Sequence, residues 1–161
     1  MSRIDERTMR SIIDTIAKEV HTSFDLNLEN ARRLSGQIQR KAEEMGVKAV
    51  IAIADRGGHP ILVERMDDAF IASYDIAVNK AFTVVSLKMS TSTLKPLAQP
   101  GGSLYGIQFT NQGKIVIFGG GEPLKDPSDI IIGGLGVSGG TEEQDTALAA
   151  YGRKLFEKGR Y

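Results

Sequence analysis

Two histidines, His21 and His59, are the residues of this sequence best suited to hold a metal ion. The chain contains no cysteine, which excludes disulfides, thiolate nucleophiles and cysteine-ligated zinc or iron–sulfur sites. Ligation of a transition metal or a haem iron would therefore rest on these imidazoles, on methionine or tyrosine, or on carboxylates. His21 falls at the C-terminal end of a predicted helix. It is there either as a solvated residue, because the helix dipole favours a cation at that end, or as an axial ligand. His59 falls in a Gly-Gly-His-Pro turn, where exposure is typical, and is the weaker candidate.

Acidic residues form two groups, Glu64 with Asp67 and Asp68, and Glu142 with Glu143 and Asp145. The first group precedes a predicted helix and the second lies in the first turn of another. Both places are typical of helix capping and of negative charge stabilised by the helix dipole. The first group is also a weak candidate for a metal site.

Two other side chains, Lys80 and Ser138, could take part in chemistry. Lys80 and Lys88 lie on a predicted helix that is otherwise small and apolar. Lysine at such positions usually extends its ammonium group to solvent, although Lys80 could instead hold an anionic ligand group. Ser138 lies between glycines in the spacing G-x-S-G, which differs from the G-x-S-x-G of hydrolases, and both histidines precede it. A serine hydrolase is therefore disfavoured.

The stretch "IIGGLGVSGG" contains the pattern G-x-G-x-x-G at Gly134, Gly136 and Gly139. In a dinucleotide-binding fold, this pattern needs a second strand with an acidic residue about 20 positions further on. Only 22 residues follow Gly139, and they are predicted to be a helix. We therefore interpret the glycines as places where another backbone or a flat ligand passes close to a strand.

Hydrophobic periodicity predicts four long helices. The first ends near His21, and the second begins at an Asn27 N-cap and stops at Gly46. The third covers "AFIASYDIAVNKAFTVVSLKM" after a cap at Asp67 or Asp68, and its small residues suggest close packing against a sheet. The fourth begins at Thr141 with a T-x-x-Q capping box.

Strand signals occur in two hairpins and one further segment. The first hairpin turns at Arg56–Gly57–Gly58–His59, and the second joins "LYGIQFT" to "KIVIF" through Asn111–Gln112–Gly113. The stretches "STSTLKPLAQPGGSL" and "GGGEPLKDPSD" are predicted loops, and "IIIGGLGV" is a fifth strand. Because most strands come in hairpins, we expect an α+β fold with a mainly antiparallel sheet covered by helices.

Composition narrows the functional classes. The 161 residues fit one domain, residues 1–161, of ordinary size. Twenty basic and twenty acidic side chains leave the formal charge at zero, so nucleic acid is not an expected partner. No apolar run could span a bilayer, and the N-terminus lacks a secretory signal pattern. We expect a cytoplasmic protein that does not contact membranes.

Four segments together resemble the GlcG/HbpS haem-binding-like family. They are "VIAIADRGGHPILVERMDDAF", "AVNKAFTVVSLKM", "QPGGSLYGIQFTNQGKIVIFGGGEPL" and "IIGGLGVSGGTEEQD", in the order typical of that family. The resemblance covers roughly residues 27 to 158 and is closest to the C-terminal domain of PduO-type corrinoid adenosyltransferases. It implies a profilin-like fold with a five-stranded antiparallel sheet flanked by helices, and homo-oligomers, octamers included.

The same resemblance implies a cofactor and a cellular setting. Relatives bind haem, and His21 is best placed to correspond to the histidine near the start of the PduO domain, as an axial ligand of the haem iron. The setting would be a bacterial microcompartment or a cobalamin-dependent pathway, with a partner protein from it. Adenosyl transfer belongs to a separate ATP-binding domain that these residues do not contain, so we do not expect it.

Three functions remain open at this point. The first is a haem- or tetrapyrrole-binding accessory protein. The second is a structural or assembly factor without a cofactor. The third is a small-molecule enzyme that uses Lys80 or the Glu64–Asp68 group.

Overall fold

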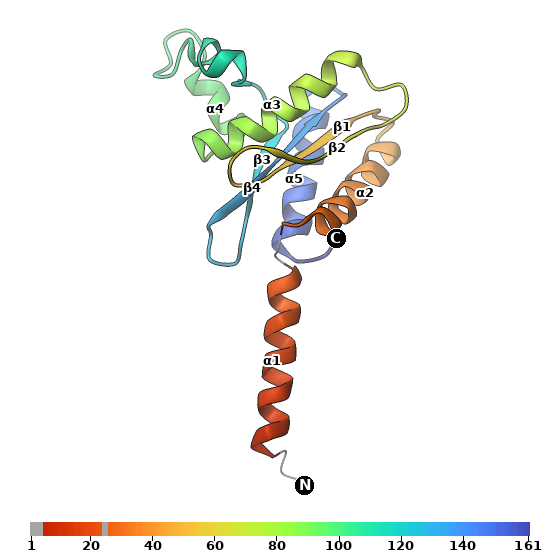
Figure 1. Cartoon of the computed structure of the whole chain (residues 1–161). Coiled ribbons are helices and arrows are strands. Elements are labelled where there is room, and N and C mark those ends of the chain that lie inside the picture. Colours follow the sequence, from red (N-terminus) through yellow and green to blue (C-terminus); the bar gives the residue numbers. More distant parts are fainter. Residues whose placement is uncertain (1–4, 24–25) are drawn as a thin grey trace.

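A four-stranded antiparallel sheet with helices on both faces forms the body of the protein (Figure 1). The computed structural model describes residues 5–23 and 26–161, with side chains for 5–16 and 26–161. The elements run in the order α1 (Glu6–Ser23), α2 (Leu28–Glu44), β1 (Val50–Ala54), β2 (Pro60–Arg65), α3 (Ile71–Leu87), α4 (Thr91–Leu97), the 3-10 turns η1 (Ile107–Phe109) and η2 (Asn111–Gly113), β3 (Gly121–Lys125), β4 (Ile131–Ser138) and α5 (Glu142–Glu157). The strand order in the sheet is β2-β1-β4-β3. The α+β class and the antiparallel sheet are therefore confirmed.

Local signals set several helix ends as predicted. The Asn27 side chain accepts a hydrogen bond of 2.9 Å from the Asn30 amide at the start of α2. That helix ends at Glu44, and Gly46 follows with φ +68. Thr141 and Gln144 form the capping box of α5. Each of these caps satisfies backbone groups that a helix end leaves unpaired.

The sheet separates two apolar cores. On one face, α2 and α5 pack over the larger side chains of the central strands, among them Ile51, Ile53 and Leu135. On the other face, Ala52 and Ala54 contact the small residues of α3. Side chains alternate between the faces along a strand, so β1 supplies large residues to one core and mostly small residues to the other.

The second predicted hairpin is wrong, and with it the five-stranded sheet. The segment "LYGIQFTNQGKIVIF" forms turns and the 3-10 helices η1 and η2, and the described residues contain four strands in all. The segment is attached to α3 instead, because the Thr83 hydroxyl accepts from the Val116 amide at 3.0 Å and its Oγ1 lies 3.3 Å from the Lys114 carbonyl oxygen. Residues Asn111 and Gln112 also have left-handed φ values of 50 and 59. The profilin-like fold stays a prediction.

A predicted loop contains the strand that was missed. β3 lies at the edge of the sheet and carries Pro123, which suggested a loop. Proline is compatible with an edge strand because its missing N–H can face away from the ladder. In the other predicted loop, residues Thr91–Leu97 form α4, capped by the Ser90 side chain, which accepts from the Thr93 amide at 3.1 Å.

The expected cap of α3 at Asp67 or Asp68 is also wrong. The N-cap is Phe70, which makes no side-chain capping bond. The preceding residues form a turn in which the Ala69 amide donates to the Met66 carbonyl at 3.1 Å and Asp68 has φ +65. This turn separates both aspartates from the helix start.

The first helix has an exposed apolar face. Figure 1 shows α1 extending away from the sheet and the helices that cover it. Its apolar side chains Met9, Ile12, Ile13 and Ile16 are about half exposed. None of the helices in the described part of the chain combines the length and apolar character needed to cross a bilayer.

Candidate functional site

The strongest metal-ligand candidate of the sequence, His21, lies outside the described side chains. The backbone of α1 continues to Ser23, so position 21 belongs to the last turn of that helix, as expected. Its role as an axial ligand stays a prediction.

The weaker candidate, His59, is an exposed turn residue. Its side chain is 83% exposed, and its Nδ1 lies 3.6 Å from Oδ1 of Asp55. The same carboxylate oxygen accepts the backbone amides of His59 and Gly57 at 3.0 and 2.8 Å. These backbone bonds lower the pKa of Asp55. The histidine therefore closes the β1–β2 turn together with Asp55.

The acidic group Glu64, Asp67 and Asp68 is spread over two surroundings. Glu64 on β2 accepts hydrogen bonds from Ser35 and Gln39 of α2. Asp67 and Asp68 are exposed in the turn after that strand. Among the described side chains, those of residues 5–16 and 26–161, no three histidines, aspartates or glutamates are grouped so that they could hold a metal ion.

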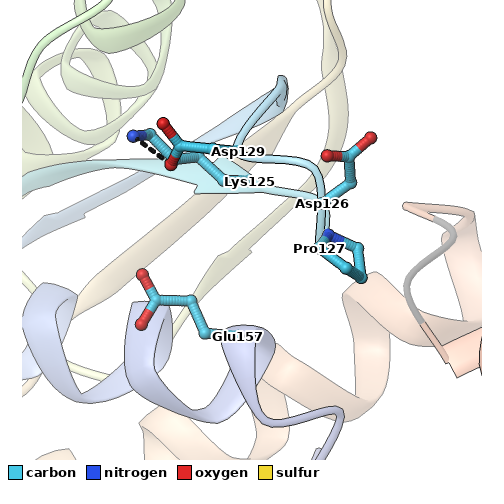
Figure 2. A pocket seen from close by; sticks show the side chains of 5 residues that line it. All are labelled: Lys125, Asp126, Pro127, Asp129 and Glu157. Carbon is cyan, nitrogen blue, oxygen red and sulfur yellow. Dashed lines mark hydrogen bonds and ion pairs between the residues drawn. The ribbon is translucent and has the colours of Figure 1, made fainter.

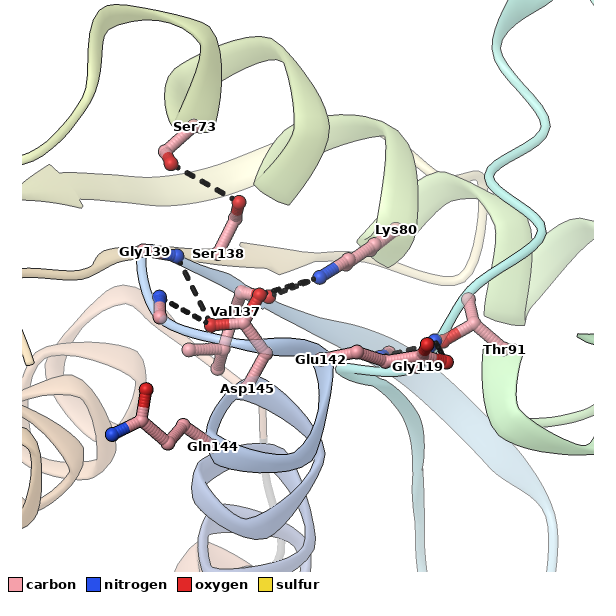
Figure 3. Close-up of polar contacts among 12 residues, drawn as sticks. Ser73, Lys80, Thr91, Gly119, Val137, Ser138, Gly139, Glu142, Gln144 and Asp145 are labelled. Atoms are coloured by element: carbon pink, nitrogen blue, oxygen red, sulfur yellow. Dashed lines mark hydrogen bonds and ion pairs between the residues drawn. The ribbon is translucent and has the colours of Figure 1, made fainter.

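Lys80 forms a buried ion pair that the sequence analysis missed. Its side chain is 0% exposed, and its Nζ lies 3.0 Å from Oδ2 of Asp145 and 2.8 Å from the Val137 carbonyl (Figure 3). The expectation that Lys80 extends to solvent is wrong, because α3 is covered by the sheet on one side and by the 114–121 segment on another. Lys80 thus joins α3 to β4 and α5.

The same site explains two glycines of the "GVSGG" stretch. The second oxygen of Asp145, Oδ1, accepts the backbone amides of Gly139 and Gly140 at 3.0 and 2.9 Å (Figure 3). In a nucleotide-binding loop such amides face a phosphate. Here a carboxylate of the chain itself occupies that position, which agrees with the rejection of a dinucleotide site.

The environment of Lys80 is closed to solvent. The Phe118 ring lies over the ammonium group, with 4.9 Å between Nζ and the ring centroid. Burial lowers the pKa of Lys80, while the charge of Asp145 opposes that shift. Because the ammonium group is covered and already has two oxygen partners, the geometry favours a structural tie over an open catalytic lysine.

Ser138 is likewise occupied. It is buried on β4, and its hydroxyl donates to the Ser73 hydroxyl of α3 at 3.1 Å (Figure 3). His59, the histidine whose side chain the structure describes, is paired with Asp55 at the β1–β2 turn. This arrangement agrees with the rejection of a serine nucleophile.

Beside this pair, Glu142 links three segments. Its Oε2 lies 2.5 Å from Nζ of Lys95 on α4, and its Oε1 accepts the Gly119 amide at 2.8 Å. The Lys95 hydrogen bond, followed by the Gly119 amide, lowers the pKa of Glu142. The carboxylate thus holds α4 and the loop before β3 at the first turn of α5.

We expect Glu142→Gln to remove a pH-dependent part of the stability. A carboxyl whose pKa is lowered by folding stabilises the protein above its unfolded pKa, near 4.5, and loses this effect as the pH falls through the folded value. At pH 7 the variant should be less stable by up to about 1 kcal/mol. Urea denaturation between pH 7 and pH 3 measures the difference, which should vanish at low pH. Glu143→Gln, in the same turn, is the matched control; an equal effect there would contradict the assignment.

A small pocket lies between the β3–β4 turn and the end of α5 (Figure 2). It measures about 220 Å³ and is lined by Lys125, Asp126, Pro127, Asp129 and Glu157. Four of these five side chains are charged, and Lys125 is already paired with Asp129 at 2.7 Å. Cofactor pockets are usually larger and mostly apolar, so this pocket does not suit a flat macrocycle.

Comparison with known proteins decides the family. The model of the family described as "Haem degrading protein HbpS-like" matches residues 26–154. The chain belongs to this family. The resemblance found in the sequence is thereby confirmed, and so is the relationship to PduO proteins.

Three similar proteins illustrate the relationship. A 15.0 kDa protein of the dhaT-dhaS intergenic region in Citrobacter freundii is 47% identical over 83% of this chain and 93% of its own length. The corrinoid adenosyltransferase PduO of Citrobacter freundii is 36% identical over 92% of this chain. The match spans 44% of PduO, less than half of that protein. The crystal structure of a PduOC:heme complex superposes with a TM-score of 0.76 at 38% identity, over 80% of this chain and 93% of that one.

Proposed function

We propose that this protein binds haem or a related tetrapyrrole and serves as an accessory protein in a cobalamin-dependent catabolic pathway. The observation that carries the proposal is the similarity, over most of both chains, to a PduOC protein crystallised with heme. The description of the HbpS-like family, which names haem, also supports it. The proposal treats residues 1–161 as one domain of that family.

The donor set of the chain fits a haem iron. Without cysteine, the nitrogen ligands available are the imidazoles of His21 and His59. His59 is 83% exposed at a turn and paired with Asp55. His21 follows the exposed apolar face of α1, formed by Met9, Ile12, Ile13 and Ile16, on the same helix. Because a macrocycle needs apolar contacts as well as a ligand, α1 is the better place for it.

The setting that we propose follows the relatives. The protein would form homo-oligomers, octamers included, in the cytoplasm or within a bacterial microcompartment. A protein of the cobalamin or microcompartment pathway would be its partner. When bound, haem would supply a redox-active iron; the chain's own part would be to ligate the iron through His21 and to shield the ring with apolar side chains.

A haemin titration tests the proposal. Wild-type protein should shift the Soret band with a saturable dependence on haemin concentration, and His21→Ala should abolish the shift because the axial ligand is lost. His59→Ala is the matched control and should bind like the wild type. Absorbance spectroscopy measures the Soret shift, and circular dichroism checks that each variant is folded.

The outcomes separate the rival functions. Equal binding by wild type and His21→Ala would exclude His21 as the ligand. No saturable shift with either protein would exclude the haem proposal and leave an assembly factor as the function to test, by retention of a pathway protein in a pull-down.

A further inference from the structure

The start of α3 carries an exposed apolar patch surrounded by acidic residues. Ile71 is 87% exposed, and Phe70 and Tyr74 beside it are also exposed. From Met66 to Asn79 the chain has three acidic residues, all exposed, and no basic one. We call this surface the acidic patch; it consists of Asp67, Asp68, Phe70, Ile71, Tyr74 and Asp75. Large apolar side chains grouped on a surface often mark an interface.

A second exposed apolar patch lies in the segment between α4 and β3, in a part of the chain whose charged residues are all lysines. Phe109 is 83% exposed and Tyr105 is also exposed, both in the segment before β3. From Ser86 to Gly121 the chain has three lysines and no acidic residue. One of them, Lys95, is paired with Glu142. The basic patch consists of Lys88, Tyr105, Phe109 and Lys114.

An unpaired hydrogen-bond acceptor lies inside the basic patch. The Oε1 atom of Gln108, between the two aromatic residues, is buried and accepts no hydrogen bond from the described residues. A buried acceptor without a donor is unfavourable. Because this atom is covered by the chain itself, a docked surface could reach it only if the Gln108 side chain turned outward.

The two patches cannot contact each other within one chain. The basic patch approaches α3 at Thr83, where Lys114 lies, and this position is about 18 Å along the helix from Ile71. Figure 1 shows the start of α3 and the segment around η1 and η2 on opposite sides of the molecule. Each patch is therefore free to face another molecule, and their charges are complementary.

We propose that the acidic patch of one copy docks on the basic patch of a second copy, head to tail. Aromatic side chains in the centre and complementary charges at the rim are the usual composition of a specific interface. Because the two contacting surfaces differ, the contact is heterologous, and repetition of it closes into a ring or extends into a filament. This inference specifies the contact of the homo-oligomer proposed above and is independent of haem binding.

Single substitutions in each patch test the contact. Ile71→Arg adds a cation opposite the basic patch, and Phe109→Ser removes the apolar anchor of that patch. Each should lower the molar mass measured by light scattering at least about twofold, since one broken surface prevents propagation. Ile130→Arg, at an exposed isoleucine of the β3–β4 turn, is the control and should leave the mass unchanged. Circular dichroism checks folding, and any contact through α1 is the same in all variants.

A mixture of the two variants distinguishes a head-to-tail contact from a symmetric one. The Ile71→Arg copy keeps its basic patch and the Phe109→Ser copy keeps its acidic patch, so one intact contact can form between them. The mixture should therefore contain a species of twice the mass of either variant, and 1 M salt should weaken it. A monomeric wild type, an unchanged mass for either variant, or no doubling in the mixture would overturn the proposal. The haemin titration of the same variants should match the wild type, so failure here leaves the proposed function untouched.

Discussion

Replacing Lys80 by methionine should destabilise the fold by about 3–5 kcal/mol, the largest effect that we expect from a single side chain outside the apolar cores. The substitution keeps the length of the side chain but leaves the Asp145 carboxylate buried without its cation. It also removes the donor to the Val137 carbonyl on β4. The free energy of unfolding from urea denaturation measures the loss.

A double-mutant cycle shows whether the charge is the cause. Asp145→Asn keeps an oxygen that can accept the Gly139 and Gly140 amides while it removes the negative charge. Lys80→Met combined with Asp145→Asn should therefore recover about 1–3 kcal/mol relative to the sum of the single variants. Lys154→Met, at an exposed position of α5, should change stability by less than about 0.5 kcal/mol. If Lys80→Met were equally mild, the ion pair would not stabilise the fold.

Signals confined to a few neighbouring residues predicted the structure well. The Asn27 cap of α2 and the Thr141–Gln144 box of α5 need only residues within one helical turn, and both are present. The hairpin at Gly57–Gly58 depends on a local turn and is also present. In each case the physical cause acts over three or four residues, so a sequence pattern contains all of it.

Predictions that depend on distant contacts were less successful. The apolar run "KIVIF" satisfies the pattern of a strand, yet the Thr83 hydroxyl of α3 binds its backbone, so the run does not join the sheet. Pro123 disfavours a strand unless the strand is known to lie at an edge, which depends on the order of the whole sheet.

The same difference between local and distant causes applies to the residues of the candidate site. Lys80 and Asp145 are 65 residues apart in the sequence, and nothing near either residue reveals the other. The available signal was the apolar character of α3 on all sides, which is typical of a buried helix and not of one that leaves a lysine in solvent. The role expected for His21 came from the family resemblance, since a helix-end histidine alone also fits a solvated residue.

The glycines of β4 form a pattern that can be read from neighbouring residues, but the reason for the pattern is a contact with a distant helix, α3. Gly134 and Gly136 match the first two glycines of a nucleotide fingerprint, but on the sheet both face α3. A Cβ atom at Gly134 would lie 2.3 Å from the Ala81 carbonyl oxygen, and one at Gly136 would lie 2.0 Å from the Ala77 carbonyl oxygen. The missing side chains let the backbones of helix and strand approach closely. The sequence leaves two partners open for this bare strand, another backbone or a flat ligand. In the structure the backbone of α3 lies there.

We therefore expect Gly136→Ala to destabilise the protein by about 3 kcal/mol or more. The nearest neighbours of the new methyl group would be backbone atoms, the Ala77 oxygen at 2.0 Å and the Ala81 nitrogen at 2.7 Å, so no side chain can rotate away to make room. The helix itself would have to shift, and forced overpacking of this kind typically destabilises by 1–3 kcal/mol or somewhat more. Urea denaturation gives the magnitude. The Lys80–Asp145 contact should weaken with it, because Lys80 lies between Ala77 and Ala81 on α3.

Gly36→Ala is the matched control for the same change in chemistry. Gly36 lies inside α2, and an added Cβ there would have its nearest neighbour at 3.9 Å, the flexible end of Arg40. Alanine in an open helical position is favoured over glycine by about 0.5–1 kcal/mol, because the unfolded chain loses freedom and the helix gains propensity. The two substitutions should thus change stability in opposite directions. If Gly136→Ala were neutral, the contact between β4 and α3 would be looser than the structure has it, and the bare strand would again be available to a ligand.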